Sequence, residues 1–296
     1  MSLRSTLRFL LRHPMGRRHP VNTLARFAEW QVVSRLSRFE QVVRWFDEVE
    51  FVVRSGETGL TGNLYTGLHE FEDMGFVLHA LRPGDLFVDV GANAGSYTLL
   101  ACAGAGAAGI SIEPIPATFA RLRKNVALNR LEGRVECHPI GLAGAPGVLR
   151  FVADCDTVNH ALAPGEEAGE TLEIPVETLD NVMASRDARV LKIDVEGLEA
   201  EVLAGAMKTL ATPGPRAVIL ETNESGRRYG REDDELIRTL VASGYGPVEY
   251  EPFARSLLPR RAGRAAHGNT IFVNDLEFFR ARVRASRAYA VAGVAI

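Results

Sequence analysis

The 296-residue chain lacks most features of a secreted or membrane-spanning protein. Its only cysteines are Cys102, Cys137 and Cys155, and an odd number without a close pair argues against a disulfide framework or a zinc site. This cysteine usage favours a reducing compartment, so a cytoplasmic location is expected. No run of about 18 or more apolar residues is present, so no membrane-spanning helix is predicted. The apolar run at residues 9–11 is too short for the core of a secretory signal peptide.

The chain as a whole has little net charge, with a formal value of −3. The two ends are nevertheless strongly basic. Nine Arg against two Glu give residues 1–44 a charge of +7, and eight Arg against two acids give residues 255–296 a charge of +6, which leaves −16 for residues 45–254. The basic ends could be ordinary solvated helix surfaces, or they could contact an anionic partner such as the inner face of a membrane.

The residues that are present favour a globular protein with an extension at each end. Hydrophobic residues make up 46% of the chain, which excludes a wholly disordered protein. Residues 1–50 are predicted to form an N-terminal helical extension, because leucines recur at helical spacing from Leu3 to Leu11 with arginines on the other side. A second helix of this extension is expected at about residues 23–39. The basic tail at residues 276–296 is predicted to form another helix.

Residues 51–275 are predicted to form the main domain. Continuous apolar runs, which suit strands buried on both faces of a parallel sheet, alternate there with helical segments. This alternation favours a doubly wound α/β fold with helices on both faces of the sheet. Strands are expected at residues 86–90, 109–112, 135–138, 190–193, 217–220, 247–250 and 270–273, and helices at residues 70–81, 97–103, 117–129, 198–210 and 233–242.

One stretch, residues 143–178, interrupts the alternation. Two β-like runs, at residues 148–152 and 172–176, are joined by a polar segment that contains glycine. We expect a β-hairpin insertion with a long loop, since loops of this length inside a domain are often lids or binding loops, and disorder is the alternative. Residues 254–268, rich in Arg, Pro and Gly, are expected to form a second loop.

The strongest local motif is the loop at residues 89–95, D-x-G-x-N-x-G, which joins the first buried strand to the next helix. Its glycines allow a sharp turn and close approach of the backbone to a ligand, and the helix behind it offers free N–H groups. Asn93 stands where a dinucleotide-binding loop usually has its second glycine, which points away from nicotinamide and flavin dinucleotides. Glu113 ends the following strand and could accept hydrogen bonds from both hydroxyls of a ribose. Together these features predict a nucleoside-type cofactor.

Several segments, in order along the chain, resemble one known family. They are residues 89–98, Glu113-Pro114, Asn125, residues 177–180 and residues 191–197. Together they resemble the FkbM family of class I S-adenosylmethionine-dependent methyltransferases, over about residues 65–223. The resemblance implies a Rossmann-like class I methyltransferase fold with a seven-stranded, mostly parallel sheet. It also implies S-adenosylmethionine as cofactor and O-methylation, often of sugar hydroxyls in glycolipids, polysaccharides or natural products.

The resemblance further implies which residues contact the cofactor. The glycine loop would pass around the methionine part, Glu113 would hold the ribose, and the segment after the third strand would flank the adenine. Tyr65 and Glu70, which precede the sheet in the sequence, could close over the methionine end of the cofactor. The expected cofactor-binding residues are Asp89, Gly91, Ala92, Asn93, Gly95, Ser96, Tyr97, Glu113, Pro114, Ile140, Gly141, Asp194, Tyr65 and Glu70.

Acids at later strand ends are candidates for the chemistry, because methyl transfer to a hydroxyl needs an aligned oxygen and removal of its proton. Asp194 and Glu196 stand two apart and would share one face if the strand at residues 190–193 continued that far. A carboxylate could orient the hydroxyl and accept its proton, and it would also suit a positive sulfonium. The expected catalytic residues are Asp194, Glu196, His160 and Glu221.

Alternatives stay open at these positions. His160 in the loop insertion could act as a base because its free pKa lies near neutrality, or it could be an ordinary surface residue. Glu196 could instead begin the next helix, where Glu199 and Glu201 complement the helix dipole. Lys192 shares the phase of the acidic pair and could simply form an ion pair with a carboxylate.

The preferred function is an S-adenosylmethionine-dependent O-methyltransferase that acts on a small molecule or glycan. The three strand-end acids could bind a divalent cation through oxygen, but no His or Cys clusters with them, and no metal is expected. A nucleic-acid methyltransferase is the alternative enzyme. It is disfavoured because the acidic middle would repel phosphates, and because the fourth strand lacks the Pro-Pro-aromatic turn that base-amine methyltransferases commonly carry. A further alternative, which is not an enzyme, is a cofactor-binding protein or a membrane-surface partner without catalytic activity.

Overall fold

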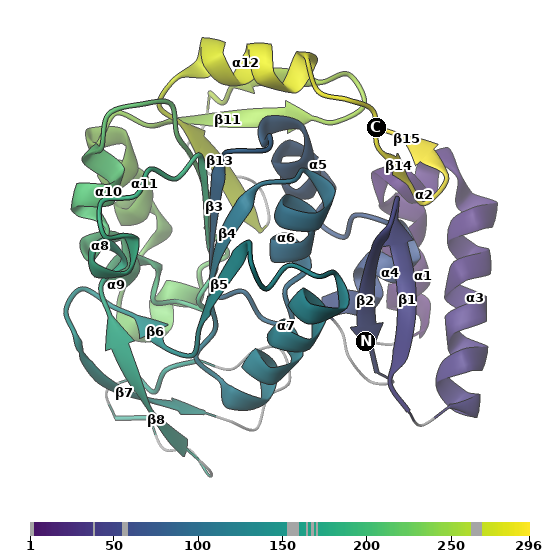
Figure 1. The fold of residues 1–296 in the computed structure, drawn as a ribbon, viewed down its shortest axis with the longest axis horizontal. Helices are drawn as coiled ribbons and strands as arrows, with labels where there is room; N and C mark the ends of the chain where they lie inside the picture. The colour runs from purple at the N-terminus through teal and green to yellow at the C-terminus, as the bar shows by residue number, and fades with distance from the viewer. Residues whose placement is uncertain are drawn as a thin grey trace.

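The computed structural model describes residues 3–37, 39–54, 59–152, 160–163, 165–166, 169, 171–261 and 268–296. An α/β domain built on one large sheet lies beside a smaller layer of helices and short strands (Figure 1). The smaller layer contains both the first and the last described residues.

The large sheet has eight strands in the order β12-β11-β13-β10-β9-β3-β4-β5. The strands from β10 to β5 in this order run parallel, and β13 is antiparallel to both β10 and β11. This confirms the Rossmann-like fold. The sheet has one strand more than the seven expected, because part of the predicted loop at residues 254–268 forms β12 and pairs with β11. The bounds are β3 Leu86–Val90, β4 Ala108–Ile112, β5 Val135–His138, β9 Val190–Ile193, β10 Ala217–Glu221, β11 Gly246–Glu251, β12 Ser256–Pro259 and β13 Asn269–Val273.

Helices cover both faces of this sheet, so its central strands are buried along nearly their whole length (Figure 1). The helix expected over residues 198–210 is in fact two, α9 and α10. The first ends at Ala204, and Gly205 follows it at a position where a side chain would collide with the carbonyl oxygen of Ala143. The bounds are α5 Phe71–Ala80, α6 Ser96–Leu99 with a π-helical continuation Leu100–Gly104, α7 Pro116–Leu128, α8 Leu179–Met183, α9 Glu199–Ala204, α10 Met207–Ala211, α11 Asp233–Ala242 and α12 Leu276–Arg284.

The insertion forms a separate three-stranded sheet, in the order β6-β8-β7. Its strands are β6 (Gly141–Leu142), β7 (Gly147–Val152) and β8 (Thr171–Glu177). The two predicted runs pair antiparallel as β7 and β8, as expected for a hairpin. Residues 153–159 of the predicted connecting loop, including Cys155, lie outside the described residues. The apolar side of the hairpin packs on the main domain around Phe151.

The N-terminal basic end of the chain and residues 285–296 form one layer, which we call the basic layer, whereas the rest of the C-terminal basic end belongs to the main domain. The helical predictions for residues 41–50 and 285–296 were wrong, because these segments form the sheet β15-β14-β1-β2. The run at β1 is rich in Val and aromatic residues that favour strands, and its partner β14 comes from the far end of the sequence. No helix among the described residues is long and apolar enough to cross a membrane. The bounds are α1 Leu3–Arg12, α2 Pro14–Arg18, α3 Pro20–Leu36, β1 Gln41–Phe46, β2 Val49–Val53, α4 Gly59–Thr66, β14 Ala290–Val291 and β15 Val294–Ala295.

Asn125, in the middle of α7, joins the basic layer to the glycine loop. Its Nδ2 donates to the carbonyl oxygen of Ala94, and its Oδ1 accepts from the backbone N–H of Val52 in β2, both at 2.8 Å. One turn later, Asn129 Nδ2 donates to the carbonyl oxygen of Glu50, and its Oδ1 accepts from the N–H of the same residue. Two amide side chains thus tie β2 to α7, and one of them also holds the glycine loop.

Candidate functional site

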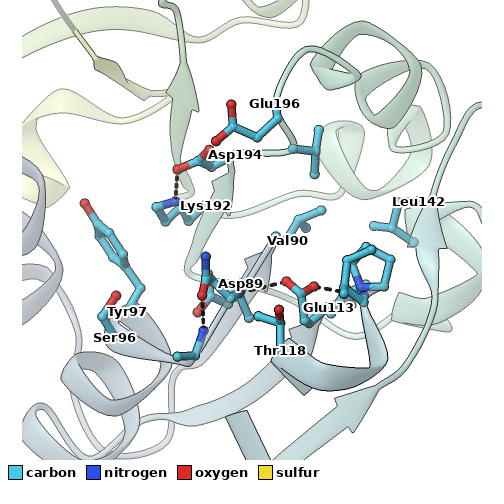
Figure 2. A pocket seen from close by; sticks show the side chains of 18 of the residues that line it. Asp89, Val90, Ser96, Tyr97, Glu113, Thr118, Leu142, Lys192, Asp194 and Glu196 are labelled. Atoms are coloured by element: carbon cyan, nitrogen blue, oxygen red, sulfur yellow. Dashed lines mark hydrogen bonds and ion pairs between the residues drawn. The ribbon is translucent and has the colours of Figure 1, made fainter. Parts of the chain in front are cut away.

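A cavity opens beyond the carboxyl ends of β3, β4 and β9, where ligands bind in open α/β sheets (Figure 2). Loops after these strands form its floor, and α4, α5 and the insertion complete its walls. The structure brings most of the predicted site residues together there. Those that line it are Glu70, Asp89, Gly91, Ala92, Asn93, Ser96, Tyr97, Glu113, Pro114, Ile140, Gly141, Asp194 and Glu196.

The glycine loop is fixed against the turn that follows β9. A side chain at Gly91 would collide with the carbonyl oxygen of Asp194, and its φ of 79° also favours glycine. The backbone N–H groups of Gly91 and Ala92 both donate to the carbonyl oxygen of Ile112. Gly95, by contrast, is absent from the cavity lining. It caps the start of α6 with φ 93° and packs near Leu122, so its role is in the turn itself.

Glu113 is held rigidly at the end of β4. Its Oε2 accepts from the N–H of Asn93 at 3.0 Å, and its Oε1 accepts from the N–H of Ile115 at 2.9 Å. The residue is only 6% exposed, and this burial raises the pKa of the carboxyl to about 7 although the N–H donors lower it. Each oxygen keeps a lone pair that can accept from a ligand hydroxyl. This geometry suits a ribose with two adjacent hydroxyls.

Asp89 lies beneath the loop at the end of β3. Its Oδ2 accepts from Thr98 Oγ1 at 2.6 Å, and Thr98 in turn contacts Ser111 Oγ at 2.7 Å. Burial raises the pKa of Asp89. These bonds anchor α6 to two strands and so fix the direction in which the helix start faces the cavity.

A polar network closes the end of the cavity next to α5. Tyr97 Oη donates to Glu70 Oε2 at 2.8 Å, and Asn269 Nδ2 donates to Glu70 Oε1 at 2.9 Å. Lys192 Nζ lies 4.7 Å from the centre of the Tyr97 ring (Figure 2). Glu70 lines the cavity, as expected, and its carboxylate is held by bonds from α6 and β13.

The structure does not bring Tyr65 into this cavity. The Tyr65 ring lies 5.2 Å from that of Phe27, and its Oη accepts from Gln31, so the side chain packs on α3. Leu60 and Asn63 line the cavity instead, because residues three apart share one face of α4. Nothing in the local sequence pattern indicated this short helix.

Sequence reasoning missed several other lining residues. Met74 follows Glu70 by one helical turn, so the spacing within the predicted helix could have indicated it. Lys192 was expected only as an ion-pair partner. Other lining residues with no local signal include Leu60, Asn63, His69, Thr118, Phe151 and Leu198.

Three carboxylates converge after β9 and β10. Asp194, Glu196 and Glu221 each place one oxygen within 4.8 Å of the others, a spacing that a divalent cation could bridge. Asp194 Oδ2 accepts from Lys192 Nζ at 2.6 Å, which confirms that Lys192 pairs with a carboxylate. The strand-alternation argument for Glu196 was wrong, because β9 ends at Ile193 and a left-handed turn, with φ 56° at Glu196, brings the two acids together.

The acids in this group differ in proton affinity. Burial, and then the neighbouring Asp194, raise the pKa of Glu196 to about 7. Burial and the same neighbours raise the pKa of Glu221 to about 10, so this side chain is protonated at neutral pH. Burial alone would lower the pKa of Lys192, but the surrounding carboxylates raise it, so the ammonium stays charged. The group can therefore exchange a proton near neutrality through Glu196.

Two expected catalytic residues do not line the cavity. Glu221 ends β10 beside Asp194, with Oε1 accepting from Asn223 and Oε2 buried without a hydrogen-bond partner among the described residues. His160 is buried in the insertion, where its Nε2 lies 3.0 Å from Glu166 Oε1. It is near enough to influence the charge of Glu196, but this placement favours a carboxylate over the histidine as the base.

This chain is similar to known methyltransferases in sequence. Residues 89–247 match the family described as methyltransferase FkbM domain. The 31-O-demethyl-FK506 methyltransferase FkbM of Streptomyces tacrolimicus is 30% identical over 234 residues, which cover 67% of this chain and 88% of that protein. A methyltransferase FkbM structure from Methylobacillus flagellatus KT has a TM-score of 0.43 at 16% identity; the match covers 64% of this chain and 43% of that one. An rRNA methylase structure from Streptococcus thermophilus has a TM-score of 0.40 at 12% identity, over 68% of this chain and 92% of that one.

Proposed function

Because this chain belongs to the FkbM family of methyltransferases, whose cofactor is S-adenosylmethionine, we propose that it methylates a hydroxyl of a sugar or a glycosylated lipid or metabolite. The observation that carries the choice of a hydroxyl is Glu196, a cavity-lining carboxyl whose pKa of about 7 suits proton removal at neutral pH. The name of the Streptomyces tacrolimicus relative, a methyltransferase for a 31-O-demethyl compound, supports methylation of oxygen.

The residues of the cavity fit the cofactor. Glu113 offers two fixed carboxylate oxygens to the ribose, and the glycine loop at Gly91–Asn93 lines the part of the cavity that would take the methionine part. Ile140 and Gly141 provide an apolar wall for the adenine beside the insertion. Glu70, at the α5 end, offers a carboxylate to the methionine ammonium. Because neither Ile140 nor Gly141 is an acid, contacts to the adenine would be apolar or made by the backbone.

S-adenosylmethionine supplies an electrophilic methyl group on a positive sulfonium. When bound, it would give this methyl group to the acceptor oxygen and would be left as a neutral thioether. The Glu196 carboxylate takes the proton of the acceptor hydroxyl, so this proton does not have to pass directly to solvent. Asp194, fixed by Lys192, provides an acceptor that orients the hydroxyl, and general-base assistance of this kind contributes about 10²–10⁴ in rate.

The test is methyl transfer from labelled S-adenosylmethionine to a panel of alkyl glycosides, extracted glycolipids and total RNA. We expect label in an alkali-stable methyl ether on a sugar. Label confined to RNA would establish the nucleic-acid alternative instead. Cofactor binding without transfer to any acceptor in whole-cell extract would support a non-catalytic role.

We also propose that this enzyme is located in the cytoplasm and works at an anionic membrane surface through the basic layer. Large apolar side chains are exposed on that layer beside arginines, a combination typical of interfacial binding. Leu36 is 83% exposed and Phe39 is 82% exposed. The other exposed residues of this kind are Leu11, Val21, Val32 and Val42, and the exposed arginines of the three helices are Arg4, Arg8, Arg12, Arg17, Arg18 and Arg35.

Co-sedimentation with phosphatidylcholine vesicles, with and without phosphatidylserine, tests this contact. We expect binding only to the anionic vesicles, at least tenfold weaker for the double variant Val32→Asp/Leu36→Asp. Val241→Asp is the matched control, because Val241 is 51% exposed on α11 of the main domain. Equal binding to both kinds of vesicle, or an equal loss in the control, would contradict the proposal.

A further inference from the structure

The turn that carries Asp194 and Glu196 is held by an acid that does not line the cavity. Glu199 Oε1 accepts from the N–H of Val195 at 3.0 Å and from the N–H of Gly197 at 3.2 Å. Glu199 is only 1% exposed, although it stands in the first turn of α9. One oxygen thus gathers two backbone donors that flank Glu196.

The backbone of this turn is of the kind that forms an anion-binding concavity. Glu196 has φ 56° and Gly197 has φ 112°, so successive N–H groups can point to the same side. Gly197 cannot carry a side chain, since a Cβ there would collide with the Tyr229 ring and the carbonyl oxygen of Ser225. The turn is therefore enclosed on its outer side and filled on its inner side by the carboxylate of Glu199.

The left-handed conformation at Glu196 is costly for a residue other than glycine, and it persists only where the surroundings maintain it. Two hydrogen bonds to one carboxyl oxygen can offset such a cost. Without them, an extended backbone at Glu196 would turn its carboxylate away from Asp194. The contact between Gly91 and the Asp194 carbonyl fixes only the first residue of the turn.

We propose that Glu199 is a positioning residue for the transfer reaction, which holds the Asp194–Gly197 turn so that the Glu196 carboxylate projects into the cavity beside Asp194. The alternative is that Glu199 serves only as an acid at a helix start, where it complements the helix dipole. Glu201 provides the matched comparison. It stands in the same first turn of α9, but its Oε1 accepts from Arg231 and not from the turn.

The first experiment measures amide hydrogen exchange by NMR, which needs no acceptor. In Glu199→Ala we expect exchange at Val195 and Gly197 at least tenfold faster than in the unaltered protein. Glu199→Gln keeps an acceptor oxygen of the same reach and should stay within about threefold, as should Glu201→Ala. Unchanged exchange in Glu199→Ala, or equal acceleration in Glu201→Ala, would overturn the proposal. Glu199→Gln also keeps the test decisive if the alanine variant fails to fold.

The second experiment separates turnover from binding and rests on the proposed function. A displacement of about 1 Å can cost around 10²-fold in rate, so kcat of Glu199→Ala should fall by 10- to 100-fold. The Kd for S-adenosylhomocysteine should stay within about threefold, and Glu199→Gln should recover most of kcat. Equal loss of kcat and affinity, or no recovery with glutamine, would overturn the positioning role. If no sugar hydroxyl is methylated by any variant, the proposed function fails, while the exchange rates still decide whether Glu199 holds the turn.

Discussion

Glu113 and Glu196 lie at the ends of two strands that flank β3, and both carboxyls have a pKa raised to about 7, yet their surroundings differ. Glu113 is fixed by two backbone N–H donors and has Asp89 as its main acidic neighbour. Glu196 lies in a left-handed turn close to Asp194 and Glu221. A shared pKa therefore does not mean a shared role. The first arrangement suits an acceptor that must not move, and the second suits a group that gains and loses a proton.

The largest effect that distinguishes the two glutamates should come from Glu196→Gln. Glutamine keeps the size of the side chain but cannot accept the hydroxyl proton, so kcat should fall by about 10²–10⁴-fold. The affinity for S-adenosylhomocysteine, measured by calorimetry, should stay within about threefold. Glu201→Gln is the control, because its partner is Arg231 on the outside of α9. A loss below tenfold in kcat would remove Glu196 from the chemistry.

Glu113→Ala should show the opposite pattern, with the main loss in cofactor binding. Hydrogen bonds to charged groups contribute about 1.5–3 kcal/mol each, and two are lost, so the Kd should rise about 100-fold or more. Calorimetry with S-adenosylhomocysteine measures the change. Glu136→Ala, an exposed acid on the adjacent strand β5, should bind normally. Unaltered affinity in Glu113→Ala would show that the ribose is held elsewhere.

The pH dependence of kcat gives a smaller but more specific comparison. Because the deprotonated form of Glu196 is the reactive one, kcat at saturating cofactor should rise about tenfold per pH unit below pH 7 and level off above it. The profile of Glu196→Gln should be flat across the same range. A profile that is the same in both proteins would assign the titration to another group.

The smallest effect concerns stability and involves Glu221. Its folded pKa of about 10 lies above the usual value of 4.5, so protonation favours the folded state, and stability declines as pH rises between these values. Glu221→Gln mimics the protonated form, so its Tm should exceed that of the unaltered protein by about 2–4 °C at pH 9 for each kcal/mol gained. The difference should shrink at pH 6. Thermal unfolding followed by circular dichroism would reveal a lower Tm at both pH values if the carboxylate were instead needed in its charged form.

The sequence predicted those parts of the site whose residues follow one another along the chain. The strand, glycine loop and helix of residues 86–99 follow one another, so turn chemistry and apolar pattern were sufficient to find them. Glu113 was found in the same way, since it ends the next strand.

The parts that the sequence did not predict depend on distant partners or on unusual backbone. β1 has its neighbour in β14, which no local periodicity could indicate. Glu196 reaches Asp194 through a left-handed turn, and the donors that Glu199 binds became visible only with coordinates. Tyr65 was misplaced because the helix α4, which sets its direction, has no clear apolar pattern.

The sheet of the basic layer has a consequence for how the protein folds. Arg287 pairs with Asp47 across 240 residues of sequence, and β14 pairs with β1 at Phe46 and Val291. Contacts so distant along the chain form slowly, because a large loop must close before they can contribute. β2 belongs to the same sheet and reaches the glycine loop through Asn125. The main domain should therefore acquire its parallel strands early, and the loop that surrounds the cofactor should reach its final rigidity only when the two ends of the chain have met.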